Sequence, residues 1–205
     1  IWKAISGEIS APAQKRKETG RERTLTDCFF CGAVSFLAAI GLNLLFSLVG
    51  PFNHSASYAE TAQAQYGVSF AVGLVLYGVV SPFVEEAIFR GLMYNRMKRC
   101  FGFWMAFLLS SLLFGCYHGN LVQALYGTLM GLLIAFLYEL FGGFETAVLS
   151  HGVANICIYG LTCAGTFKKL SLGGTILLAA VTLCSAAGCL IYMTRKRGKN
   201  GLLHD

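Results

Sequence analysis

Three short windows of this sequence place carboxylates, histidines and an amide within otherwise apolar stretches. The windows are residues 84–90, 114–120 and 151–155. An ionisable side chain at the centre of a membrane helix costs about 2.5–3.5 kcal/mol on insertion scales, so few are kept without a function. A peptide hydrolase needs a base that activates water and donors that stabilise the developing oxyanion. The three windows therefore predict a hydrolytic site that is assembled from separate helices.

The first window holds two adjacent glutamates followed by an arginine. On a helix, Glu86 and Arg90 are i,i+4 neighbours that can pair, whereas Glu85 is turned away from Glu86 by about 100°. Two neighbouring carboxylates in a low dielectric resist ionising together. An arginine that pairs with one of them leaves the other as a candidate general base. The alternative interpretation is an interfacial helix after Pro82 whose charges are solvated.

The second and third windows contribute imidazole and amide groups. His118 follows Phe114 by four residues, and Asn155 follows His151 by four. His151 and Asn155 therefore share one helix face, about 6 Å apart along the axis. A lone histidine such as His118 is often a packing residue, and two polar groups on one face of a membrane helix can serve only to join helices. The hydrolytic interpretation depends on all three windows together.

Other catalytic chemistries lack a motif. The zinc-protease motif His-Glu-x-x-His and the serine-hydrolase motif Gly-x-Ser-x-Gly are both missing from the sequence. Cys28 and Cys31 have half of a zinc or redox spacing, but no second Cys or His pair stands nearby. We therefore expect no cofactor.

The elements that must position these residues are predicted to be membrane helices. The chain has 205 residues, of which 56% are hydrophobic and 13% are charged, against about 45–50% and about 25% in soluble domains. A membrane crossing needs about 20 apolar residues. We expect an all-α polytopic membrane bundle of about six transmembrane helices around a polar intramembrane cavity. The blocks lie near residues 28–51, 68–84, 101–117, 121–140, 146–163 and 172–193. Residues 51–67 are expected to form a polar loop.

The positive charges predict the orientation. The net charge is +6, and fourteen of the 16 Lys and Arg residues lie in three clusters beside apolar blocks, Lys168 and Lys169 being the exceptions. By the positive-inside rule, the clusters face the cytoplasm. We expect a cytoplasmic arm over 1–27, a membrane-embedded domain over 28–194 and a cytoplasmic tail over 195–205. Basic residues dispersed in this way argue against nucleic-acid binding.

The three motifs occur in the order Glu-Glu-x-x-x-Arg, Phe-x-x-x-His and His-x-x-x-Asn. This order resembles the CAAX prenyl protease and bacteriocin-processing family, also called CPBP or Abi. The matching residues are Glu85, Glu86 and Arg90, then Phe114 and His118, then His151 and Asn155. The resemblance covers roughly residues 68–163, which form the motif core.

The resemblance implies an intramembrane glutamate endopeptidase whose water-filled cavity opens toward the cytoplasm. It implies that Glu85 and His118 activate the water and that His151 and Asn155 form the oxyanion hole. It also implies that Glu86, Arg90 and Phe114 are supporting residues. The ligand types would also permit zinc, which is the alternative to a cofactor-free site.

The implied substrate is a peptide or lipidated protein, or a bacteriocin-like peptide, in a bacterial cytoplasmic membrane. The partners expected are this substrate, the surrounding lipids and a possible membrane protein. Two alternatives stay open. One is a non-catalytic membrane scaffold or bacteriocin immunity factor, and the other is a proton-coupled carrier, for which no internal repeat is visible.

Overall fold

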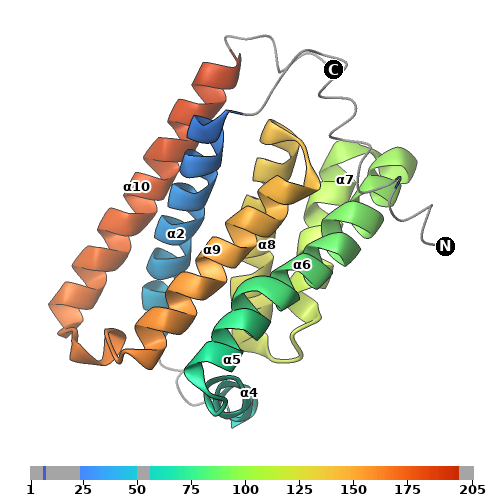
Figure 1. The fold of residues 1–205 in the computed structure, drawn as a ribbon. Coiled ribbons are helices and arrows are strands. Elements are labelled where there is room, and N and C mark those ends of the chain that lie inside the picture. The colour runs from blue at the N-terminus through green and yellow to red at the C-terminus, as the bar shows by residue number, and fades with distance from the viewer. Residues whose placement is uncertain (1–6, 8–23, 50–55, 199–205) are drawn as a thin grey trace.

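The computed structural model describes residue 7 and residues 24–49 and 56–198. Most of the predicted arm over 1–27, and residues 199–205 of the predicted tail, therefore lie outside the described residues. Within the described part of the chain every regular element is a helix, and the helices form one bundle (Figure 1). In chain order they are α2 (Leu25–Ser47), α4 (Ala56–Tyr66), α5 (Phe70–Val75), η1 (Leu76–Val80), α6 (Ser81–Glu86), η2 (Ala87–Tyr94), α7 (Asn95–Cys116), α8 (Leu121–Phe141), α9 (Phe144–Cys163), η3 (Phe167–Lys169) and α10 (Leu172–Gly198).

Five helical stretches are long and apolar enough to cross a membrane, as judged by length and composition. They are Leu25–Ser47, Phe70–Cys116, Leu121–Phe141, Phe144–Cys163 and Leu172–Arg197. Large apolar side chains such as Phe29, Trp104 and Leu177 are exposed on them. Exposed apolar surface of this extent is typical of a protein that contacts lipid. The predicted all-α polytopic bundle is confirmed.

The second and third predicted blocks lie in one helical stretch, Phe70–Cys116. The helix continues past Pro82 and turns back at Gly102, where φ is 79°, a conformation that favours glycine. The rings of Phe89 and Phe114 lie 5.2 Å apart, whereas a straight helix would separate these residues by about 37 Å. The stretch therefore has two limbs, which contain the two predicted blocks.

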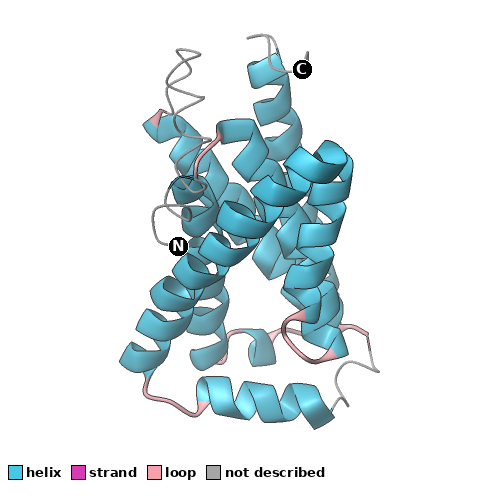
Figure 2. Ribbon diagram, turned by 90° about the vertical axis from the view of Figure 1, so that its right-hand side faces the viewer, coloured by secondary structure: helices cyan, strands magenta, loops and turns pink. Residues whose placement is uncertain are grey.

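One prediction is wrong: residues 51–67 are expected to form a loop. Residues Ala56–Tyr66 instead form the helix α4. The segment ASYAETAQAQY is rich in Ala, Glu and Gln, which are strong helix formers. Its low hydropathy excludes a crossing, and Figure 2 shows α4 lying across one end of the bundle. The prediction failed because it took polarity as evidence against a helix.

The bundle has two chemically different ends. At one end, Arg197 near the end of α10 pairs with Asp27 at the start of α2, at 2.8 Å. The Arg197 guanidinium also lies 4.6 Å from the ring centre of Phe141, the last residue of α8. Lys98 pairs with Glu139, also near the end of α8, at 2.7 Å. We call this end the basic pole, and the end that carries α4 the α4 pole.

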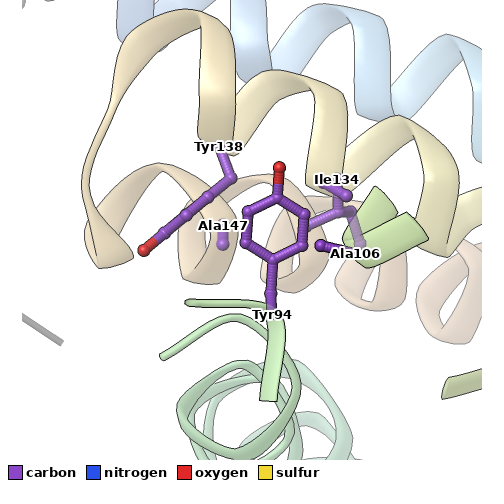
Figure 3. Packing of buried hydrophobic residues seen from close by; sticks show 6 residues of the cluster. Tyr94, Ala106, Ile134, Tyr138 and Ala147 are labelled. Carbon is purple, nitrogen blue, oxygen red and sulfur yellow. The ribbon is translucent and has the colours of Figure 1, made fainter. Parts of the chain in front are cut away.

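The buried core near the basic pole fixes η2 against α8. Tyr94 and Tyr138 pack edge to face with ring centres 5.6 Å apart, and Figure 3 shows the Tyr94 ring next to Ile134 and Ala147. The Tyr94 hydroxyl donates to Glu139 at 2.7 Å. This packing holds the helix that carries the two glutamates in a defined register against α8.

Candidate active site

A cavity of about 560 Å³ lies between α4 and the middle of the bundle. Its volume falls within the range of about 300–1,000 Å³ that is usual for ligand sites. The four residues predicted to be catalytic all contribute to its walls, and so does Phe114. These four are Glu85, His118, His151 and Asn155. Glu86 and Arg90 do not line the cavity, although both lie next to it in the sequence and in the fold.

Glu85 presents its carboxylate to the cavity from α6. Its Oε1 accepts a hydrogen bond from the Ser81 hydroxyl one turn earlier, and its Oε2 lies 3.7 Å from His151 Nε2. The residue is 9% exposed. One carboxylate oxygen is therefore held by a neutral donor, and the other remains next to an imidazole at the cavity wall.

Glu86 is fully buried and serves as an acceptor for two other site residues. Its Oε1 accepts from Arg90 Nη1 at 3.0 Å and lies 2.8 Å from His151 Nδ1. Arg90 is also fully buried, and its Nη2 donates to the Gly131 carbonyl of α8 at 2.8 Å. The turn of about 100° between adjacent helical residues thus separates the two glutamates: one faces the cavity and the other faces the protein interior.

Phe114 packs against Arg90 and against both histidines of the site. The Arg90 guanidinium lies 4.7 Å from its ring centre, an arrangement that a cation–π attraction stabilises. The ring packs edge to face against His118 and His151, with centre distances of 5.2 and 5.4 Å. A single apolar side chain therefore contacts three polar groups, which come from η2, from the turn after α7 and from α9.

The hydrogen bond that His118 makes defines its tautomer. Nδ1 lies 2.9 Å from the Phe114 carbonyl oxygen, and a carbonyl can only accept. In the neutral ring Nδ1 therefore carries the proton, and Nε2 is left as an acceptor. His118 can then take a hydrogen bond or a proton from a water molecule in the cavity.

Asn155 is held by a backbone group that Pro82 leaves free. Its Nδ2 donates to the Tyr77 carbonyl at 2.9 Å. In a regular helix the Tyr77 carbonyl would accept a hydrogen bond from the backbone N–H of Ser81, and in a π-helix from that of residue 82. Ser81 donates instead to the Leu76 carbonyl, and proline has no N–H. The amide of Asn155 has two N–H donors, so one remains for a ligand.

Several residues of the site belong to none of the three motifs. Ser81 and the Tyr77 carbonyl orient predicted residues, and the only sequence signal for them is Pro82, which leaves backbone groups unpaired and favours distorted helix such as η1. The face of α4 toward the cavity also lies outside the motifs. It contributes Tyr58, Thr61, Ala62, Ala64, Gln65 and Tyr66. Burial raises the pKa of Tyr58 and of Tyr66, so both phenols are neutral at physiological pH.

A close approach of α7 and α8 positions His118. A Cβ atom on Gly115 would lie 2.2 Å from the Ala124 carbonyl oxygen and 2.2 Å from Thr128 Oγ1. Neither neighbour is the far end of a flexible side chain. The two helices can therefore touch here only because residue 115 is glycine.

We expect Gly115→Ala to lower both the melting temperature and the hydrolytic activity, because α7 and α8 must separate and carry His118 with them. Overpacking of this kind costs about 1–3 kcal/mol. The melting temperature in detergent measures the effect. Gly160→Ala in α9 is the matched control, since a Cβ there meets nothing within 4 Å. Equal melting temperatures for the Gly115→Ala variant and the wild type would contradict the argument.

The site offers carboxylate and imidazole groups, which are also ligands for zinc. Across residues 24–49 and 56–198, however, no group of three or more His, Cys, Asp or Glu side chains is arranged to hold a metal ion. A catalytic zinc site normally takes three protein ligands and one water. The residues described here therefore do not fit a bound zinc ion in their present arrangement.

Comparison with known proteins agrees with the motif resemblance. Residues 67–157 match a family model described as type II CAAX prenyl endopeptidase Rce1-like. The chain is 27% identical over 136 residues to a Bacillus subtilis (strain 168) protein named "Putative membrane peptidase YdiL". That alignment covers 57% of this chain and 55% of the relative, so the chain spans about half the length of the curated relative that it matches. No solved structure matches the chain.

The matched region contains all seven residues that the motifs single out, and the resemblance is confirmed. The five apolar helices and the membrane peptidase relative together identify an integral membrane protein.

Proposed function

We propose that this chain, whose residues 67–157 form a domain of the Rce1-like family of type II CAAX prenyl endopeptidases, is an intramembrane endopeptidase. The observation that carries the proposal is the cavity that Glu85, His118, His151 and Asn155 line together. Glu85 and His118 activate a water molecule, and His151 and Asn155 stabilise the oxyanion. Glu86, Arg90 and Phe114 hold these groups in position.

In the first step, Glu85 takes a proton from water while His118 Nε2 accepts a hydrogen bond from the same molecule. The water oxygen then bonds to the carbonyl carbon of the scissile peptide. Ser81 supports this role because its hydroxyl holds one Glu85 oxygen and so orients the other. General-base catalysis of this kind typically contributes about 10²–10⁴-fold to the rate.

The tetrahedral intermediate places a negative charge on the former carbonyl oxygen. The free N–H of Asn155 and the Nε2–H of a protonated His151 are donors for it. The C–N bond then breaks, and the proton held by Glu85 passes to the leaving nitrogen. The products are a new carboxyl end and a new amino end.

The substrate class proposed is a membrane-associated or lipidated protein, or a bacteriocin-like peptide. The host membrane proposed is the bacterial cytoplasmic membrane, with both termini on the cytoplasmic side. The experiment that tests the function uses detergent-purified protein and a library of prenylated and unprenylated peptides, with cleavage products identified by mass spectrometry. Binding of peptides without any cleavage would favour the scaffold or immunity-factor alternative instead.

We expect chelators to leave the cleavage rate unchanged, because Glu85 and His118 carry the proton transfer without a metal ion. The measurement is the cleavage rate before and after prolonged treatment with a strong zinc chelator. Elemental analysis of the purified protein gives an independent result. A stoichiometric metal, together with activity that disappears on chelation and returns with zinc, would replace this mechanism by a metal-dependent one.

A further inference from the structure

We propose that the cavity opens to the non-cytoplasmic face of the membrane, so that the enzyme cleaves polypeptide segments that have already reached that face. The cleavage part of this inference rests on the proposed function. The orientation part rests only on the charges and on the position of the cavity. The two parts can therefore be tested separately.

The basic residues gather at the pole that lies far from α4. Arg96, Lys98 and Arg99 stand just before the Gly102 turn, and Arg195, Lys196 and Arg197 end α10. The contacts of Arg197 with Asp27 and Phe141, and of Lys98 with Glu139, bring these clusters to one end of the bundle. Further basic residues precede α2 in the sequence, at positions 3, 15, 16, 17, 21 and 23. The positive-inside rule places this pole in the cytoplasm.

The cavity reaches the opposite pole. Its walls include Asn43 and Ser47 at the end of α2, Gln123 at the start of α8, and one face of α4. Gln123 and Glu139 lie on the same helix, and the helical rise separates them by about 24 Å. The ring of Tyr66 on α4 stacks on Tyr159 near the end of α9, at 5.5 Å. The cavity thus extends from the middle of the bundle toward α4 and away from the basic pole.

The sequence at the α4 pole is compatible with translocation across the membrane. Residues 51–67 contain no Lys or Arg, and Glu60 is their one charged residue. The turn at 117–120 carries no Lys, Arg, Asp or Glu. Lys168 and Lys169 are the two basic residues on this side. The side of the membrane with the larger number of Lys and Arg residues in its short loops is the cytoplasmic side. Two lysines at the α4 pole are fewer than the basic residues at the other pole, so they do not reverse the orientation.

This geometry resolves a conflict between two expectations. The charges predict cytoplasmic termini, whereas the family resemblance implies a cavity that opens toward the cytoplasm. The start of α2 and the end of α10 lie at the basic pole, and the cavity extends to the α4 pole. Both expectations cannot hold for this chain. The charge distribution belongs to this chain itself, and we therefore retain the cytoplasmic termini.

The orientation is tested by labelling single cysteines in the full chain. One variant keeps the native, exposed Cys100 beside Arg99, and a second carries Glu60→Cys on the exposed side of α4. In each variant every other native cysteine is replaced by alanine, which in the Glu60→Cys variant includes Cys100. A membrane-impermeant maleimide is applied to intact cells and then to permeabilised cells.

We expect Glu60→Cys to react in intact cells and Cys100 to react only after permeabilisation. The reverse pattern would overturn the proposal. A green fluorescent protein fused to the C-terminus of the otherwise unaltered chain gives a second measurement that needs no cysteine replacement. Such a fusion fluoresces only in the cytoplasm, so fluorescence is expected and its loss, with the fusion present in the membrane, would overturn the proposal.

The sidedness of cleavage is tested with membrane vesicles and an impermeant peptide that the purified protein cleaves. We expect cleavage by right-side-out vesicles, and by inverted vesicles only after detergent opens them. Cleavage by intact inverted vesicles alone would overturn the inference and leave the proposed function standing. A library that yields no cleaved peptide in detergent would contradict the proposed function, while the labelling pattern would still decide the orientation.

Discussion

Replacement of Glu85 by glutamine is expected to lower the rate of peptide cleavage by about 10²–10⁴-fold, the contribution typical of a general base. Glutamine has nearly the volume of glutamate, and its carbonyl oxygen can still accept the Ser81 hydroxyl. It cannot take a proton from water at neutral pH. The variant should therefore fold normally and bind peptides while failing to cleave them.

The measurement is the cleavage rate of detergent-purified protein, with helical circular dichroism and the melting temperature as checks of the fold. Glu60→Gln is the matched control, because Glu60 is exposed on α4 and does not line the cavity. It makes the same chemical change outside the site and should leave the rate unaltered. If Glu85→Gln retained wild-type cleavage, Glu85 would not be the base.

Replacement of Arg90 by methionine is expected to destabilise the fold by about 3–5 kcal/mol, because the buried Glu86 carboxylate loses its arginine partner and keeps only the contact with His151. Arg90 and Glu86 are both fully buried, and their ion-pair distance is 3.0 Å. The change also removes the hydrogen bond to the Gly131 carbonyl and the cation–π contact with Phe114. Glu86 is 0% exposed, so bulk solvent does not reach the remaining carboxylate.

The free energy of unfolding in mixed detergent, or the melting temperature, measures this effect. The double variant Arg90→Met, Glu86→Gln removes both charges together and should recover a large part of the loss, since an uncharged pair needs no solvation. A double variant less stable than Arg90→Met alone would show that the uncompensated charge is not the cause. Arg96→Met is the control, because Arg96 lies on the same helical stretch and is not buried.

Much of the architecture could be predicted from local patterns. Apolar runs of sufficient length predict membrane helices wherever they occur, and i,i+4 spacing pairs Glu86 with Arg90 and places His151 beside Asn155. The prediction failed where low hydropathy was the sole ground for expecting a loop. The polar residues 51–67 are predicted to form a loop, yet Ala56–Tyr66 form a helix.

The composition of the site was predictable in part, because buried ionisable residues are costly and therefore conspicuous. All seven residues chosen from the motifs lie in or directly beside the cavity. The distinct environments of the two glutamates could not be predicted. They follow from contacts between segments far apart in the sequence, such as Glu86 with His151, which are 65 residues apart.

Residue types and local spacing were thus sufficient to predict a membrane bundle, the seven polar and aromatic residues that gather in or beside one cavity, and the ends that carry the positive charge. Three features emerge only in the folded molecule: Glu85 faces the cavity while Glu86 faces Arg90, the Tyr77 carbonyl accepts a hydrogen bond from Asn155, and the cavity extends to the α4 pole. Each of these depends on how one helix is rotated and placed against another, and that packing is set by side chains from several distant segments at once.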